Sequence, residues 1–108
     1  MRQSVVELVT YQLKSGVTEQ QLAATHEGVH SFLNRQPGFI YRSLSQDDSE
    51  QWFDIVYWQD LATATAAGEA FMTDPAGQAL GELADMDTVV MRHMLTAAEV
   101  LGDQVAAA

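Results

Sequence analysis

The stretch FIYRSLSQDDSEQWFDIVYW, residues 39–58, decides the fold of this chain. Its two ends, 39–45 and 51–58, are rich in aromatic and β-branched residues, as strands are. The polar QDDSE between them is longer than a two-residue turn, so the pattern predicts a β-hairpin closed by a longer loop. We therefore expect two adjacent antiparallel strands at the centre of the chain.

Strand and helix patterns flank this hairpin on both sides. Strands are predicted at 4–13 (SVVELVTYQL) and 87–95 (DTVVMRHML). Thr18 followed by Gln21 fits a capping box and predicts one helix of about five turns, which Pro37 and Gly38 end.

A second helical region follows the hairpin. Asp60 is a plausible N-cap for the alanine-rich LATATAAGEAFM, and Pro75 stands at the first position of another helix, DPAGQALGELA. The order βαββαβ predicts an α+β, ferredoxin-like fold, a four-stranded antiparallel sheet with helices on one face.

The strand patterns also predict a partner. WFDIVYW and VVMRHML are apolar on both faces, whereas a sheet with one wet face alternates apolar and polar residues. We expect a homodimer formed through the sheet face that the helices leave bare. Residues 1–96 would form the domain, and 97–108 a tail that is either a short helix or frayed.

Composition limits the function. The 108 residues suit one domain, and five basic against fifteen acidic residues give a net charge of -10, which argues against nucleic-acid partners. No cysteine is present, which excludes thiolate ligands and cysteine nucleophiles. The first residues are too polar for a signal peptide or membrane span, so a soluble, cytoplasmic protein without membrane contact is expected.

Three motifs in this order carry a resemblance to a known family: PGF at 37–39, Trp58 at the end of the hairpin, and FMTDPAGQAL at 71–80. Over roughly residues 4–96 the chain resembles the antibiotic biosynthesis monooxygenase-like branch of the dimeric α+β barrel superfamily. The resemblance implies two sheets from two chains forming a barrel, and a pocket in each subunit between sheet and helices. It also implies cofactor-free monooxygenation, with no metal or organic cofactor.

The motifs depart from those of two branches of that family. In the quinone-forming monooxygenases an asparagine precedes the tryptophan by four residues and an arginine follows the Asp-Pro; these positions look like Asp54 and Ala76 here. An ionised Asp54 only accepts hydrogen bonds, whereas an amide also donates them. The heme-degrading branch uses an asparagine and a histidine where this chain has Val9 and Gly68, which disfavours heme degradation.

The stretch ATHEGVH, residues 24–30, places His26 and His30 one helical turn apart. At 100° per residue, His26 points at the sheet and His30 lies on the flank of the apolar stripe. HEGVH matches the His-Glu-x-x-His pattern of zinc proteases, but Glu27 faces away from the sheet. The readings that stay open are a core histidine, a metal ligand with His30 or His93, and a pocket acid or base at His26.

The strand phase places Asp54 on the same face as Trp52 and Trp58. Asp54 is then either a base with a raised pKa or the partner of Arg42 or Arg92 in an ion pair. We predict His26, Asp54 and Trp58 as catalytic candidates. Further residues are predicted to line the substrate pocket, and each could equally be structural: His30, Trp52, Phe71, Met72 and His93.

Three functions are compatible with these residues. The first is a cofactor-independent monooxygenase acting on a small aromatic or polyketide-like molecule. The second is a non-catalytic dimer that binds a small ligand or has a structural role, and the third is a cyclase or isomerase in which His26 or Asp54 is the base. No Gly-x-Ser-x-Gly elbow or glycine-rich phosphate loop supports other chemistry.

Overall fold

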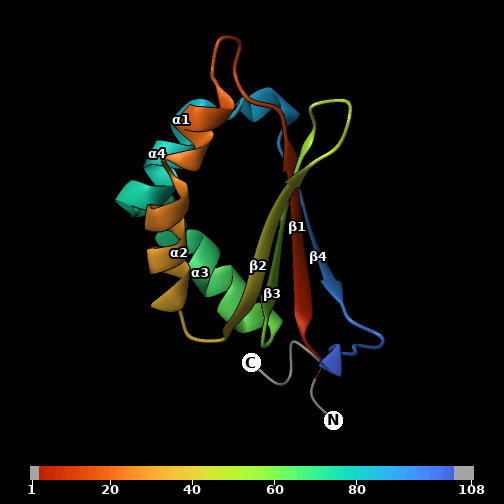
Figure 1. Cartoon of the computed structure of the whole chain (residues 1–108). Coiled ribbons are helices and arrows are strands. Elements are labelled where there is room, and N and C mark those ends of the chain that lie inside the picture. Colours follow the sequence, from red (N-terminus) through yellow and green to blue (C-terminus); the bar gives the residue numbers. More distant parts are fainter. Residues whose placement is uncertain (1–2, 104–108) are drawn as a thin grey trace.

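The computed structural model describes residues 3–103 and has two layers, a twisted sheet and a layer of helices on one side of it (Figure 1). The predicted α+β, ferredoxin-like fold is confirmed. The elements in chain order are β1 (Val5–Tyr11), α1 (Glu19–Ala23), α2 (His26–Asn34), β2 (Phe39–Gln46), β3 (Trp52–Trp58), α3 (Leu61–Thr73), α4 (Pro75–Leu83), the 3-10 helix η1 (Met86–Thr88) and β4 (Val90–Leu95).

The sheet has the strand order β2-β3-β1-β4, and every neighbouring pair is antiparallel. Asp54 on β3 lies opposite Val9 on β1 and opposite Leu44 on β2. Residues opposite one another point to the same face of the sheet, so this register decides which side chains share the space under the helices.

The alternating burial along β3 distinguishes the two faces of the sheet. Trp52, Asp54, Val56 and Trp58 are buried and alternate with half-buried residues, as a period of two requires. The buried set faces the helices and forms the core. That core also contains Val5 and Tyr11 of β1, Leu22 of α1, Val29, Phe32 and Leu33 of α2, Ala64 and Ala67 of α3, and Leu80 of α4.

The prediction of one continuous helix after Thr18 is wrong. The capping box of Thr18 and Gln21 is present and opens α1, but the helix ends at Ala23 and α2 begins at His26. The Thr25 hydroxyl donates to the Leu22 carbonyl at 2.6 Å, and the Thr25 N–H donates to the same carbonyl. These short-range bonds replace the regular helical pattern and start α2 on a new turn.

Strand β2 contains an irregularity that the alternation of its sequence does not show. Phe39 lies opposite Trp58, but Tyr41 lies opposite Tyr57, so the register shifts between Phe39 and Tyr41. The shift brings Arg42 opposite Val56, on the helix-covered face. A strict alternation from Phe39 would have placed it on the bare face.

The remaining helix ends follow their capping signals. Asp60 caps α3, and Asp74 accepts the Ala76 N–H and starts α4 with Pro75 at its first turn. After β4, Glu99 accepts a hydrogen bond from the Ser4 hydroxyl at 2.8 Å, which ties the start of the tail to the residue just before β1. Residues 104–108 of the predicted tail lie outside the described part of the chain.

Candidate functional site

The centre of the helix-covered face is an ion pair between Arg42 of β2 and Asp54 of β3. The Arg42 Nε donates to Asp54 Oδ1 at 2.9 Å, and Nη2 donates to Oδ2 at 2.7 Å. The two side chains are only 3% and 11% exposed. This two-point contact consumes both carboxylate oxygens and leaves the third guanidinium nitrogen, Nη1, pointing elsewhere.

Tyr11 extends this group onto β1. It lies opposite Trp52, two residues along β1 from the partner of Asp54, so both side chains share one face. Burial raises the pKa of Tyr11, and the negative charge of Asp54 raises it further. The phenol therefore stays protonated at neutral pH and offers an O–H donor beside the ion pair.

His26 and His30 approach from α2. Their rings stack at 6.1 Å between centroids with 20° between the planes. The pKa of His30 is lowered from its ordinary value, first by burial and then by the positive charges of Arg42 and His26. His30 is an exposed residue, whereas His26 is half-buried and its Nδ1 is buried, so His26 is the histidine of the pair that faces the interior.

Four buried polar atoms around this face have no hydrogen-bond partner among the described residues. They are Tyr11 Oη, His26 Nδ1, Arg42 Nη1 and Trp58 Nε1. Buried polar groups are normally paired, because an unpaired one costs about 1–3 kcal/mol. Arg42 Nη1 and Trp58 Nε1 are obligate donors and the Tyr11 phenol is a donor here, so the arrangement suits a bound molecule that accepts hydrogen bonds.

Trp58 lies at the other end of β3 from Trp52. It lies four positions after Asp54, which corresponds to about 13 Å along a strand. Its ring packs edge-on against Phe39 at 5.8 Å between centroids. The ring of Phe71 on α3 packs against that of Phe32 on α2, with 5.0 Å between the ring centroids. This contact links the two helices on the covered side of the sheet.

Other predicted pocket residues lie apart from this group. Met72 is 78% exposed on the outside of α3. His93 of β4 is opposite Glu7, and its Nε2 lies 3.0 Å from Glu7 Oε1. Glu7 also lies opposite Val56, whose side chain is on the helix-covered face. His93 therefore points to the same face, but from β4, the strand at the edge of the sheet. The sequence had left open which side His93 faces.

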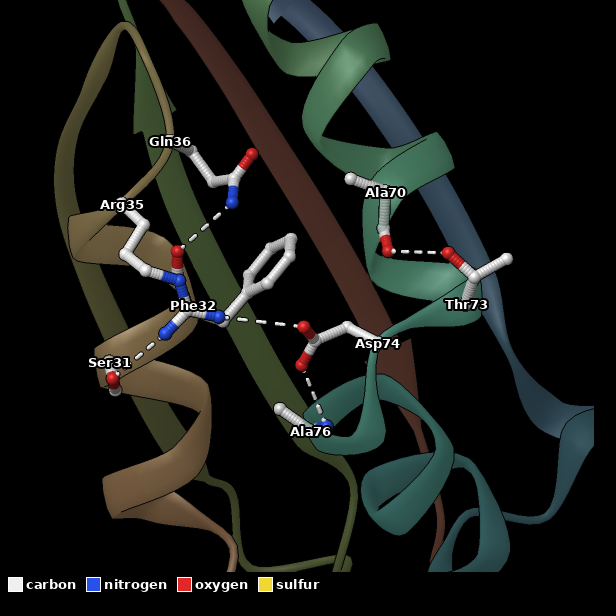
Figure 2. A network of polar contacts seen from close by, with 8 residues as sticks. All are labelled: Ser31, Phe32, Arg35, Gln36, Ala70, Thr73, Asp74 and Ala76. Atoms are coloured by element: carbon white, nitrogen blue, oxygen red, sulfur yellow. Dashed lines mark hydrogen bonds and ion pairs between the residues drawn. The ribbon is translucent and has the colours of Figure 1, made fainter.

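Two surface hollows stand out, and neither includes His26, Asp54 or Trp58. The first runs between α1, α2 and α4 and is lined largely by small residues. Figure 2 shows the contacts beside it: Arg35 donates to Ser31 at 3.0 Å and reaches Asp74 at 3.4 Å, while Asp74 caps α4. These contacts tie α2 to α4. The second hollow lies by the turn after β1 and includes Trp52.

Among residues 3–103 there is no group of three or more His, Asp or Glu side chains placed to hold a metal ion. Glu27, the glutamate of HEGVH, is exposed on α2. Within the same range no helix has the length and apolar character needed to cross a membrane.

The sequence predicted Arg42 or Arg92 as the ion-pair partner of Asp54, and Arg42 is that partner. Tyr11 is the member of the buried group that the sequence did not identify. The register shift in β2, which brings Arg42 under the helices, has no signal in the sequence of that strand.

Comparison of the sequence with protein-family models and with curated proteins gives no match. Solved structures do match. SnoaB, a cofactor-independent oxygenase from Streptomyces nogalater, is 18% identical with a TM-score of 0.63, covering 92% of this chain and 96% of its own. A putative antibiotic biosynthesis monooxygenase from Bordetella bronchiseptica is 14% identical with a TM-score of 0.74, covering 93% and 100%.

A third similar structure is a NIPSNAP domain protein from Burkholderia xenovorans, 17% identical with a TM-score of 0.66, covering 91% of this chain and 99% of its own. The matches cover nearly the whole length of each of these similar proteins. The chain therefore has the subunit fold of the antibiotic biosynthesis monooxygenase-like, dimeric α+β barrel proteins. At these identities the comparison establishes the fold alone.

Proposed function

We propose that this protein is a homodimeric, cofactor-independent monooxygenase that acts on a small aromatic or polyketide-like molecule held between the sheet and the helices. The observation that carries the proposal is the set of four buried, unpartnered polar atoms on the helix-covered face. Such a set is a ready recognition site for a flat molecule bearing oxygen atoms. The description of SnoaB as a cofactor-independent oxygenase supports the reaction class.

In this proposal His26 is the base. Its Nδ1 is buried and unpartnered, and a neutral imidazole can remove a phenolic or enolic proton. The resulting anion is electron-rich enough to react with dioxygen directly. Conversion of a ring CH₂ to C=O then takes one oxygen atom from O₂, and the other leaves as water with the two hydrogens.

Asp54 has a supporting part in this scheme. Both of its oxygens accept hydrogen bonds from Arg42, so the carboxylate is engaged by the guanidinium instead of facing a substrate proton. Asp54 therefore holds the guanidinium in place, while Arg42 and Tyr11 face the oxygen atoms of the bound molecule. Trp58 would close the far end of the ligand site.

The test is oxygen uptake with a panel of hydroxyaromatic and anthrone-like compounds. We expect uptake with at least one of them, and loss of it in His26→Ala but not in Asn34→Ala, an exposed position at the end of the same helix. Turnover without oxygen consumption would replace the proposal by the cyclase or isomerase alternative. Binding without any turnover would support the non-catalytic dimer.

The proposed dimer interface is the face of the sheet that the helices leave uncovered. Ile55 and Tyr57 of β3 are half-buried there, and Tyr41, Val90 and Met94 are exposed by 57%, 51% and 42%. Exposed large apolar side chains gathered on one face in this way are typical of subunit interfaces.

The dimer is tested by light scattering at micromolar concentration. We expect a dimer for the unaltered chain and a monomer for Ile55→Lys, because a charge would be buried at the interface. Thr65→Lys, on the exposed side of α3, is the matched control and should stay dimeric. A monomer for the unaltered chain would refute the dimer.

A further inference from the structure

The second surface hollow lies where β1 runs into α1 and where β2 turns back into β3. Figure 1 shows these two connections at the same end of the molecule. Seven residues between 12 and 19 and four between 46 and 52 line the hollow, which has a volume of about 430 Å³. Ligand pockets span about 300–1,000 Å³, so the hollow has room for a small molecule.

The floor of this hollow includes Trp52, which is only 7% exposed. Its indole N–H has no hydrogen-bond partner within residues 3–103, and it is not one of the four fully buried unpartnered atoms. The N–H therefore reaches the surface of the molecule, where Trp52 borders the hollow. Because a donor on a buried side chain cannot turn away to find a partner, it suits an acceptor that enters the hollow.

Three charged residues also line the hollow, Lys14 and Glu19 on one side and Glu50 on the other. All three are exposed, and every ion pair in the described part of the chain involves other side chains. One positive and two negative charges around the same small hollow are therefore left for a ligand.

Glu50 keeps its place in the wall of the hollow with a strained backbone. Its φ is 67°, and it is the one non-glycine residue with a positive φ among residues 3–103. Glycine adopts this conformation freely, whereas a side chain strains it. The Asp47 carboxylate accepts the N–H groups of Ser49 and Gln51 at 2.9 and 3.0 Å and so holds the loop in this shape. A strained glutamate where glycine would be relaxed indicates a use for its carboxylate.

These groups define a ligand by its charges. Two carboxylates complement two ammonium groups, while the Lys14 ammonium and the Trp52 N–H complement one carboxylate. We propose that the second hollow binds a free diamino acid of the lysine or ornithine type, at a site separate from His26, Asp54 and Trp58. The surplus negative charge around the hollow, in a chain of net charge -10, disfavours dicarboxylic acids.

Three probes that differ by one group test the proposal: L-lysine, L-norleucine, which lacks the side-chain ammonium, and cadaverine, which lacks the carboxylate. Binding is measured by titration calorimetry at neutral pH and low ionic strength, where ion pairs are least screened. We expect lysine to bind with a Kd of about 1 mM or lower. Each of the other two should bind about fivefold more weakly, because one exposed ion pair contributes up to about that factor.

Glu50→Gly separates a lost contact from a lost fold. Glycine removes the carboxylate and relaxes the positive φ, so the midpoint of urea unfolding should rise while lysine binds about fivefold more weakly. Lys14→Met should remove the preference for lysine over cadaverine. Glu69→Gln, an exposed position on α3 outside the hollow, is the matched control and should leave lysine binding unchanged.

Equal affinity for the three probes, or no binding of lysine at about 10 mM, overturns the diamino acid site. Unchanged lysine binding in Glu50→Gly also overturns it, and an equal loss in Glu50→Gly and Glu69→Gln does so because it reveals a non-specific charge effect. Weaker binding in Glu50→Gly alone supports the site. These results are independent of oxygen uptake, since His26 and Asp54 lie outside the hollow.

Discussion

Breaking the Arg42–Asp54 pair should cost the protein a large part of its stability. Asp54→Asn removes the negative charge and turns an amide N–H₂ toward one of the guanidinium donors. The Arg42 side chain is 3% exposed, so its charge cannot regain water without opening the sheet face. Removing one partner of a buried pair typically costs about 3–5 kcal/mol.

Urea unfolding followed by the fluorescence of Trp52 and Trp58, both buried, measures this loss. With a slope near 1.5 kcal/mol per molar urea, the midpoint should fall by about 2–3 M. Protein concentration is held constant because a dimer gains stability with concentration. The resemblance places an asparagine at position 54, yet here the substitution should not be tolerated, because Arg42 depends on the charge.

The double variant Arg42→Met with Asp54→Leu is the control for this reasoning. It replaces the pair by apolar side chains, which is often neutral or stabilising, so its midpoint should return to within about 1 M of the unaltered protein. If Asp54→Asn shifts the midpoint by less than about 0.5 M, the pair is not electrostatically isolated from solvent. A double variant as unstable as the single one would equally refute the argument.

Two further predictions concern α4 and α2. A Cβ on Gly77 would overlap the carbonyl oxygen of Phe71, so Gly77→Ala should destabilise the protein by about 1–3 kcal/mol. A Cβ on Gly81, four residues on, would meet no atom within 4 Å, so Gly81→Ala should instead stabilise the protein by up to about 1 kcal/mol. Urea unfolding of both variants tests this. The pKa of His30 is lowered by desolvation and by the charge of Arg42, so the unfolded chain binds more protons than the folded one. The free energy of unfolding should therefore fall as the pH drops below about 6.5. His30→Gln should flatten this dependence of stability on pH, and an unchanged dependence would contradict the prediction.

The sequence by itself determined the order of the elements and the inward face of β3. Alternation along one strand depends only on the local backbone, so the grouping of Asp54 with Trp52 and Trp58 on one face could be predicted and is confirmed. The capping box at Thr18 likewise acts within one turn of helix. Local signals of this kind can be found in any single sequence.

Tertiary structure decided which residues meet under the helices. The register shift in β2 turns Arg42 toward Asp54, and pairing with β1 places Tyr11 beside them and His93 opposite Glu7. The Thr25 contacts that divide the first helical region are local, but whether they prevail over helix continuation depends on packing against the sheet. Strand register arises from hydrogen bonds between distant segments, which periodicity along one segment does not encode.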